Sequence, residues 1–443
     1  MDFPRGKNFI RVTGSATFLF LFFLPLISTQ DVSIWEYMPL KKELRNGMTV
    51  IYHKDESTAL TALQILFKGG TGAVPDEKDG LAYLTTRLVV EIPDMDKVQE
   101  LMSQASSVSM NCRGDYSLIT ISCLSENLER TLKVMAYIMC NPLFSSLRIT
   151  NNKEYMVYRK KLDEDDSTTL AHNAQLEAFF GENGYGSPVL GTRESLKGIK
   201  SKDIEDFYRK YFTGKNMIIS VSSDLGENEL MNMLDKLLGQ FPRGEFVKLK
   251  PSSPSVPEEK QKYFEKDAEQ TLISIIFPLP GMNRKNFVLA TFTENLLGKG
   301  VNSKLWPLRS REKLAYNVDS HAVQMKEGGI LKTYLETENE KKEIALEALK
   351  KILNSIHEEG ITEEEFQEVK VTTRANFLRS NETKTARTAN LAYFETTGLG
   401  YDFLIRFFSE LDSLTYEETN AYIKEILDPE KGVEVVVGPK NGS

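Results

Sequence analysis

The sequence predicts an α+β protein made of two homologous halves, each a mostly antiparallel sheet with helices packed on one face. Three observations support this fold class. Segments in the two parts of the chain repeat at a constant spacing. Strand and helix patterns are partly segregated within each part, rather than strictly alternating. A stretch rich in Pro, Ser and charged residues separates the two parts.

The repeat is clearest near the end of each half. Residues 194–222 read as a helix, a Gly turn and an apolar strand, and residues 410–438 show the same order. Tyr208 matches Tyr422, an offset of 422 − 208 = 214. The chain therefore reads as two copies of a unit of roughly 200 residues.

Strand patterns open each copy. Alternating or continuous apolar runs of four to nine residues are typical of strands. Arg113-Gly114-Asp115 lies between two of these runs, which indicates a hairpin with Gly at its turn. The expected strands are Thr49–Tyr52, Thr61–Phe67, Ser106–Cys112 and Tyr116–Leu124 in the first copy and Leu272–Phe277 in the second.

Helical patterns follow the strands. The clearest is Lys341–Glu359, where apolar residues lie on one broad face and Gly360 ends the pattern. The acidic triplet after Thr362 favours the start of another helix, because acids stabilise the positive end of a helix dipole. The other expected helices are Leu128–Cys140, Asn152–Leu162, Leu170–Phe180 and Lys202–Tyr211.

The first thirty residues differ from the rest. Basic residues precede the apolar run Ala16–Ser28, which is shorter than the roughly 20 residues that span a bilayer. This pattern is typical of a signal peptide and predicts export, periplasmic or secreted, or a membrane anchor if the signal is not cleaved. The expected divisions are a signal peptide at 1–29, a first half at 30–247, a linker at 248–262 and a second half at 263–443.

Composition excludes several other classes. The chain has 443 residues and a net charge of −8, so it lacks the basic character of a nucleic-acid-binding protein. Its three cysteines form no C-x-x-C pair and cannot make a disulfide framework. None of the four histidines lies three to five residues from another, so a local pair of histidine metal ligands is absent from the sequence.

Four segments in order resemble the pitrilysin/insulinase family of zinc peptidases, including the mitochondrial-processing-peptidase-like proteins. Residues 66–88 resemble the family's zinc-site segment, and residues 183–196 and 206–220 resemble its mid-domain signature. Residues 297–318 resemble its Gly loop followed by Leu-Arg and Leu-Ala-Tyr. The resemblance covers the whole chain after the signal peptide.

The zinc motif of that family, H-x-x-E-H, is lost here. Alignment on Gly80-Leu81-Ala82 places Tyr83 at the first ligand His, Thr86 at the general-base Glu and Arg87 at the second His. The resemblance implies a third ligand about 75 residues further on, seven residues after an acidic position held here by Glu154, which selects Lys161. Arg87 is always protonated and accepts no metal, and Glu91, one turn later, is its expected partner.

The second half keeps residues that the resemblance associates with substrate. Arg309 and Tyr316 fall at the positions of the family's peptide-binding Arg and Tyr. An Arg fork can donate to a carbonyl or carboxylate, and a Tyr hydroxyl can stabilise an oxyanion. Gly298, Gly300 and Ser303 belong to the Gly loop, which we expect to border a peptide chamber. Their spacing does not match a phosphate-binding P-loop.

These features predict a non-catalytic member of the family that pairs with a zinc-bearing homologue and helps to bind an unfolded peptide. No cofactor is expected in this chain, since zinc would lie only in the partner subunit. A homodimer is a further possibility. The alternatives are a structural or peptide-binding scaffold with no role in proteolysis, and an active lone peptidase with rearranged ligands.

Overall fold

The computed structural model describes residues 38–249 and 253–440. These residues belong to one compact unit. The predicted signal peptide, residues 1–29, lies outside the described residues. Within the described ranges, every helix is too short or too polar to span a bilayer.

The first half contains a six-stranded sheet in the order β1-β2-β6-β3-β5-β4. Only β2 and β6 run parallel, and every other neighbouring pair is antiparallel. The predicted hairpin is confirmed, because β4 and β5 pair antiparallel around the turn at Arg113–Asp115. The strands are β1 Leu40–Glu43, β2 Thr49–Lys54, β3 Leu60–Phe67, β4 Ser107–Cys112, β5 Ser117–Leu124 and β6 Met217–Ser223.

The second half contains a five-stranded sheet in the order β7-β11-β8-β10-β9. Its one parallel pair is β7 with β11. This order and these directions repeat β2-β6-β3-β5-β4 of the first sheet, so the predicted two homologous halves are confirmed. The strands are β7 Gln261–Glu265, β8 Gln270–Leu279, β9 Asn317–Met325, β10 Gly328–Glu338 and β11 Val433–Gly438.

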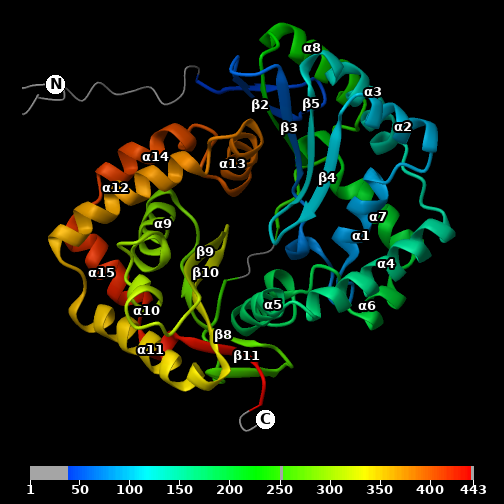
Figure 1. The fold of residues 1–443 in the computed structure, drawn as a ribbon. Coiled ribbons are helices and arrows are strands. Elements are labelled where there is room, and N and C mark those ends of the chain that lie inside the picture. The colour runs from blue at the N-terminus through cyan, green and yellow to red at the C-terminus, as the bar shows by residue number, and fades with distance from the viewer. Residues whose placement is uncertain (1–37, 250–252, 441–443) are drawn as a thin grey trace, which may run out of the picture. The chain divides into compact units, whose positions relative to one another are not determined.

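The helices also correspond between the halves (Figure 1). Along the sequence, two helices lie between β3 and β4 in the first half and between β8 and β9 in the second. Five more helices precede the last strand of each half, which is β6 or β11. The first half has α1 Leu81–Val90, α2 Met95–Ser103, α3 Leu128–Cys140, α4 Ser146–Glu164, α5 Ser167–Phe180, α6 Arg193–Gly198, α7 Ser201–Tyr211 and α8 Glu227–Leu238. The second half has α9 Arg284–Gly298, α10 Trp306–Ser310, α11 Lys342–Glu359, α12 Glu363–Arg379, α13 Lys384–Thr397, α14 Phe403–Asp412 and α15 Tyr416–Ile426.

Local sequence explains where these helices begin and end. The α11 helix ends at Gly360, whose φ of 81° favours glycine, as the sequence predicts. The acidic triplet opens α12, where Thr362 and Glu365 form a capping box by accepting from each other's backbone N–H. The predicted helices are therefore real, although α4 begins six residues before the expected Asn152.

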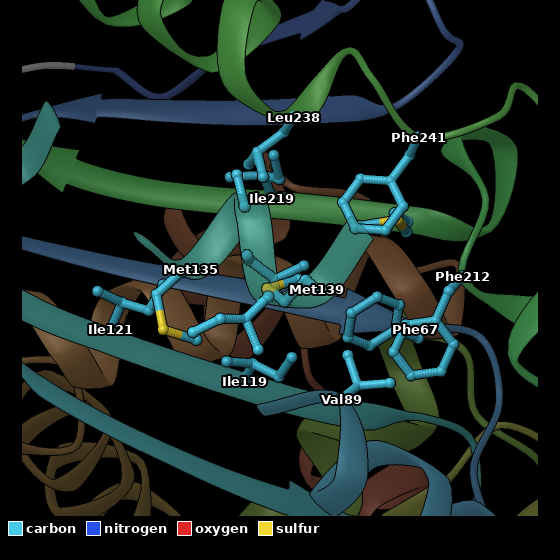
Figure 2. Close-up of a cluster of buried hydrophobic side chains, with 14 of the residues drawn as sticks. Phe67, Val89, Ile119, Ile121, Met135, Met139, Phe212, Ile219, Leu238 and Phe241 are labelled. Carbon is cyan, nitrogen blue, oxygen red and sulfur yellow. The ribbon is translucent and has the colours of Figure 1, made fainter. Parts of the chain in front are cut away.

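The core of the first half lies between its sheet and its own helices. Phe67 on β3 packs against Phe212 with ring centroids 4.1 Å apart. Met139 of α3 lies near Phe67 and Met135 lies near Ile121, and both methionines are fully buried (Figure 2). Full burial of a side chain of this size stabilises the fold by roughly 1.5–3 kcal/mol. This cluster holds α3 on the face of the sheet that the first half's own helices cover.

The opposite face of each sheet is covered by a helix from the other half. The α13 helix of the second half packs on β3 and β6, while α5 of the first half packs on β8 and β11. Both are the third of the five helices that precede the last strand of their half. Each half's own helices pack on one face, as predicted, and this reciprocal exchange covers the other face.

A buried ionic group fixes α13 in place. The ammonium of Lys384 donates to the backbone carbonyls of Asp55, Thr58 and Leu60 at 2.7, 2.7 and 2.9 Å. The guanidinium of Arg387 pairs with the Asp55 carboxylate. Lys384 and Asp55 are each only 8% exposed. The charges are therefore shielded from solvent but paired with one another and hydrogen-bonded, which is what buried charges require.

The corresponding hairpin turns of the two halves also meet. The Asp115 carboxylate accepts the backbone N–H of Lys326, in the β9–β10 turn, at 3.0 Å, and it accepts the Tyr185 hydroxyl. Burial raises the pKa of Asp115.

The described part of the predicted linker packs against the first half, since Ser255 donates its backbone N–H to the Phe179 carbonyl at 2.8 Å. Its last two residues belong to β7.

Candidate functional site

The residues at the expected zinc positions lie on α1. This helix begins after Gly80, whose φ of 88° and close approach to the Leu190 carbonyl leave little room for a side chain. Thr86 is fully buried, and its hydroxyl donates to the Ala82 carbonyl at 2.8 Å. The position of the general base therefore holds a short side chain that is bonded to its own helix.

Arg87 is held by α4. Its Nε donates to Oδ1 of Asn152 at 2.6 Å, and its guanidinium carbon lies 3.8 Å from the centre of the Tyr155 ring. Tyr83 belongs to the same group of side chains. Burial raises the pKa of Tyr83, the nearby Tyr155 phenol raises it further, and the charge of Arg87 lowers it. Stacking on an aromatic face suits a guanidinium and stabilises it without an acidic partner.

Glu91 has a different partner from the one expected. Its Oε2 accepts from Arg148 Nη2 and from Asn152 Nδ2, both at 2.9 Å. Arg148 also donates to the Leu88 carbonyl at 3.0 Å, where it satisfies a group at the end of α1. The spacing from Arg87 to Glu91 suits an ion pair on one helix, but α4 provides a closer cation for Glu91 and a ring for Arg87.

The structure does not place Lys161 with Tyr83 and Arg87. Six residues of an α-helix turn through about 240° beyond Tyr155, so Lys161 lies on another face of α4. It is exposed and lines a hollow against residues 191–197. Arg159, one turn after Tyr155, is the α4 residue whose charge acts on Tyr83, and it pairs with Asp163 at 3.5 Å. Arg159 therefore adds a second arginine to the face of α4 that carries Tyr155.

These side chains do not fit a zinc ion. Zinc needs three N or O donors with free lone pairs, and catalysis needs a carboxylate to take a proton from the bound water. Arg87 and Arg159 offer only N–H donors. Among the described residues, no group of three or more His, Cys, Asp or Glu is arranged to hold a metal.

Arg309 and Tyr316 come together in the second half. Both line a depression of about 400 Å³ between α10 and the start of β9. Arg309 is exposed and stacks over Trp306 at 5.2 Å, while Tyr316 is 52% exposed. The Tyr316 hydroxyl donates to Oε1 of Glu338 at 3.0 Å. That hydrogen bond and the Glu338 charge raise the pKa of Tyr316, so the phenol is protonated at neutral pH.

Three further residues of this depression were not predicted. Lys313 and Lys341 add two cations to its wall, and Glu338 forms an ion pair with Lys341 at 3.0 Å. Lys313 lies in the same loop as Tyr316, but Glu338 is the last residue of β10 and Lys341 follows it, so only the pairing of β9 with β10 brings them near. The depression can therefore donate from several cations and one phenol to a carbonyl or carboxylate.

The Gly loop lines a separate hollow, together with residues of β9 and α12. A side chain at Gly298 would come within 2.1 Å of the backbone nitrogen of Ser320 on β9, which explains the need for glycine. Gly300 has a φ of 98°, and its carbonyl accepts the Ser303 hydroxyl at 2.8 Å. All three residues line a hollow of about 570 Å³ with Lys304, which pairs with Glu365 on α12.

Comparison with known proteins identifies the family. The model described as "Insulinase (Peptidase family M16)" matches residues 49–193, and the one described as "Peptidase M16 inactive domain" matches residues 198–372. The chain belongs to this family, as the sequence motifs indicated. The degenerate zinc positions lie in the part matched by the first of these models.

Three relatives illustrate the similarity. An "uncharacterized zinc protease" of Rickettsia felis is 21% identical over 77% of this chain and 83% of its own. The "non-peptidase homolog YmxG" of Helicobacter pylori is 23% identical over 85% of this chain and 88% of its own. A crystal structure of a "peptidase M16 inactive domain" from Pseudomonas fluorescens matches with a TM-score of 0.82 and 19% identity, covering 91% of this chain and 98% of its own. This last likeness shows the fold.

The site and the family together define a non-catalytic member of peptidase family M16. The scaffold of the zinc segment is present, with α1 packed against α4, while the side chains that would bind and activate a metal are replaced.

Proposed function

We propose that this chain is an exported, non-catalytic subunit that pairs with a zinc-bearing member of the family and helps to bind its peptide substrate. The observation that carries this proposal is the contrast between the two sites. Arg309 and Tyr316 lie exposed in one depression, whereas Arg87 at the zinc position is stacked on Tyr155. An unfolded peptide is the expected substrate, and the zinc would be held by the partner.

The chemistry of the depression supports a role in binding the peptide main chain. The Arg309 fork can donate two parallel hydrogen bonds to a carboxylate or one to a carbonyl. The Tyr316 hydroxyl can donate to a substrate oxygen once that oxygen displaces Glu338. Both groups are exposed, so neither incurs a desolvation penalty in the free chain and a second chain can reach them.

The test is reconstitution with a zinc-bearing family member from the same genome. We expect association by light scattering and cleavage of an unfolded peptide by the complex. Loss of one well-placed donor to a developing oxyanion costs roughly a hundredfold in kcat. Tyr316→Phe should therefore slow turnover by up to that amount, and Arg309→Ala should mainly raise KM.

The matched control is Arg311→Ala. Arg311 is exposed, lies two residues from Arg309 and does not line the depression. It should leave both constants unchanged. If Arg309→Ala and Tyr316→Phe also leave turnover unchanged in an assembled complex, the chain is a scaffold and the proposal fails. Sequencing the N-terminus of the mature protein tests export, with cleavage expected near residue 29.

A further inference from the structure

A hollow of about 910 Å³ lies on the face of α4 that carries Lys161, apart from both sites described above. Glu154, Val157, Tyr158 and Lys161 follow one another at helical spacing and form one wall. The segment Gly191–Lys197 forms the other. The spacing of seven residues between Glu154 and Lys161 is thus a real helix stripe, but it lines this hollow.

The hollow is basic, in contrast to the whole protein. Five cations line it against three acids, Glu154, Glu164 and Glu194, a balance of 5 − 3 = +2 in a chain of net charge −8. Among the described residues, no acid lies within ion-pair distance of Lys160, Lys161, Arg193 or Lys197, whereas nearby Lys78 pairs with Asp203 at 3.0 Å. Lys153 donates to the Ile199 carbonyl at 2.6 Å. The five are Lys153, Lys160, Lys161, Arg193 and Lys197.

The hollow also offers apolar surface. Tyr158 is 61% exposed on one wall, Val157 is half-buried beside it, and Leu196 lies buried opposite. An exposed aromatic ring rimmed by cations resembles the anchors of protein interfaces, where aromatic side chains supply contact area at low entropic cost.

We propose that this hollow binds an acidic segment of a partner protein that carries an apolar side chain between its carboxylates. The unpaired cations supply charge complementarity, and Tyr158 with Val157 receives the apolar group. The three acids interspersed among the cations, and the net charge of the chain, disfavour a continuous polyanion such as nucleic acid or an anionic membrane. This inference does not depend on the peptidase partner proposed above.

Fluorescence anisotropy on the full chain tests the proposal. The probe is a short labelled peptide with Asp and Glu at both ends and Trp-Leu at its centre. One comparison peptide replaces each acid by its amide, a second replaces Trp-Leu by Ser-Ser, and a third probe is a short labelled oligonucleotide. We expect the first peptide to bind at least roughly tenfold tighter than either comparison peptide, with an affinity that falls as salt rises.

Two sets of variants locate the binding. K161E/R193E/K197E should weaken binding by roughly tenfold or more, and Tyr158→Ser, which keeps every charge, should also weaken it. The control R130E/K202E/K351E makes the same change of charge at exposed residues outside the hollow and should bind as wild type. A melting curve checks that each variant folds. If the triple variant does not fold, Tyr158→Ser alone tests whether the hollow binds the peptide.

Three results would overturn the proposal. The first is failure of the acidic peptide to bind the wild-type chain. The second is equal binding by the hollow and control variants, and the third is an oligonucleotide that binds as tightly as the peptide and loses affinity in the same variants. The last result would indicate a polyanion site instead.

Discussion

The guanidinium carbon of Arg87 lies 3.8 Å from the centre of the Tyr155 ring, at the place where the family's zinc site would lie between α1 and α4. A cation–π contact and the hydrogen bond to Asn152 thus join two helices that a metal joins in an active enzyme. The replacement explains how the scaffold of the site persists after its ligands are lost.

The first prediction concerns metal content. The purified chain should hold no stoichiometric zinc after dialysis, because Arg87 and Arg159 present donors where zinc needs lone pairs. Elemental analysis of the dialysed protein checks this. One zinc per chain that resists mild chelation would revive the lone-peptidase alternative, whereas a surface ion removed by that treatment would not.

The second prediction concerns rebuilding the site. Tyr83→His, Thr86→Glu and Arg87→His can be completed by a fourth change, either Lys161→Glu or Arg159→Glu. Because Arg159 acts on Tyr83 and Lys161 faces another side of α4, the Arg159 version should bind zinc at least roughly tenfold tighter, since even groups beyond the ligands shift metal affinity by that much.

Competition with a chromophoric chelator measures the two zinc affinities. Neither variant should cleave unfolded peptides efficiently, because the groups that would orient the new ligands are absent and Thr86 lies in a fully buried position where a carboxylate is costly. Equal zinc affinity for the two variants would contradict the placement of Arg159, and robust chelator-sensitive cleavage would show that a complete site survives.

The third prediction concerns the anchor between the halves. Lys384→Met removes a buried ammonium that donates to three backbone carbonyls and lies near the Asp55 carboxylate. Breaking such a buried charged group should lower the free energy of unfolding by about 3–5 kcal/mol. Guanidinium titration measures it. Lys285→Met removes a largely exposed partner of Glu418 and should cost at most about 1 kcal/mol, so similar losses would argue against the anchor.

The fourth prediction concerns pH. Burial, with smaller contributions from Lys332, Arg113 and His321, lowers the pKa of His172 from 6.5 to about 4. The unfolded chain therefore binds a proton that the folded chain refuses, so stability is present above pH 6.5 and falls as the pH drops toward 4. The full loss would be about 3–4 kcal/mol, since the two states differ by 6.5 − 4 = 2.5 pKa units and each unit is about 1.4 kcal/mol.

His172→Gln isolates this contribution from carboxylates that titrate in the same range. Unfolding free energies of wild type and variant are measured by denaturant titration at several pH values. As the pH falls below 6.5, the wild type should lose stability relative to the variant. A difference that stays constant with pH would mean that His172 is protonated equally in both states.

Much of the fold could be predicted from the sequence because its patterns are local. The predicted helix Leu128–Cys140 matches α3 residue for residue, and the end of α11 at Gly360 follows from one glycine. The reciprocal exchange of α5 and α13 could not be predicted. The small and polar residues on the face of β3 that α13 covers, such as Gln64, do not indicate which helix packs on them.

The candidate site shows the same division. Tyr83 and Arg87 share a face because they are four residues apart on one helix, which spacing alone predicts. Which residue of α4 faces α1 depends on how the two helices pack. The resemblance selected Lys161, which lines another face of α4, whereas Arg159 lies one turn from Tyr155, the ring that stacks on Arg87. Glu338 joins Tyr316 only through strand pairing across more than twenty residues of sequence, which no local pattern records.

The exchange of α5 and α13 also sets the order in which the chain can mature. The first sheet gains its last strand at Ser223, but α13, which covers the face opposite α3, is complete only at Thr397, 397 − 223 = 174 residues later. At about 5–20 residues per second, synthesis of that interval takes roughly 10–35 seconds. During this time all strands of the first sheet have been synthesised, but the face that α13 covers is exposed to solvent. A nascent chain in that state is the form most exposed to aggregation and most in need of a chaperone.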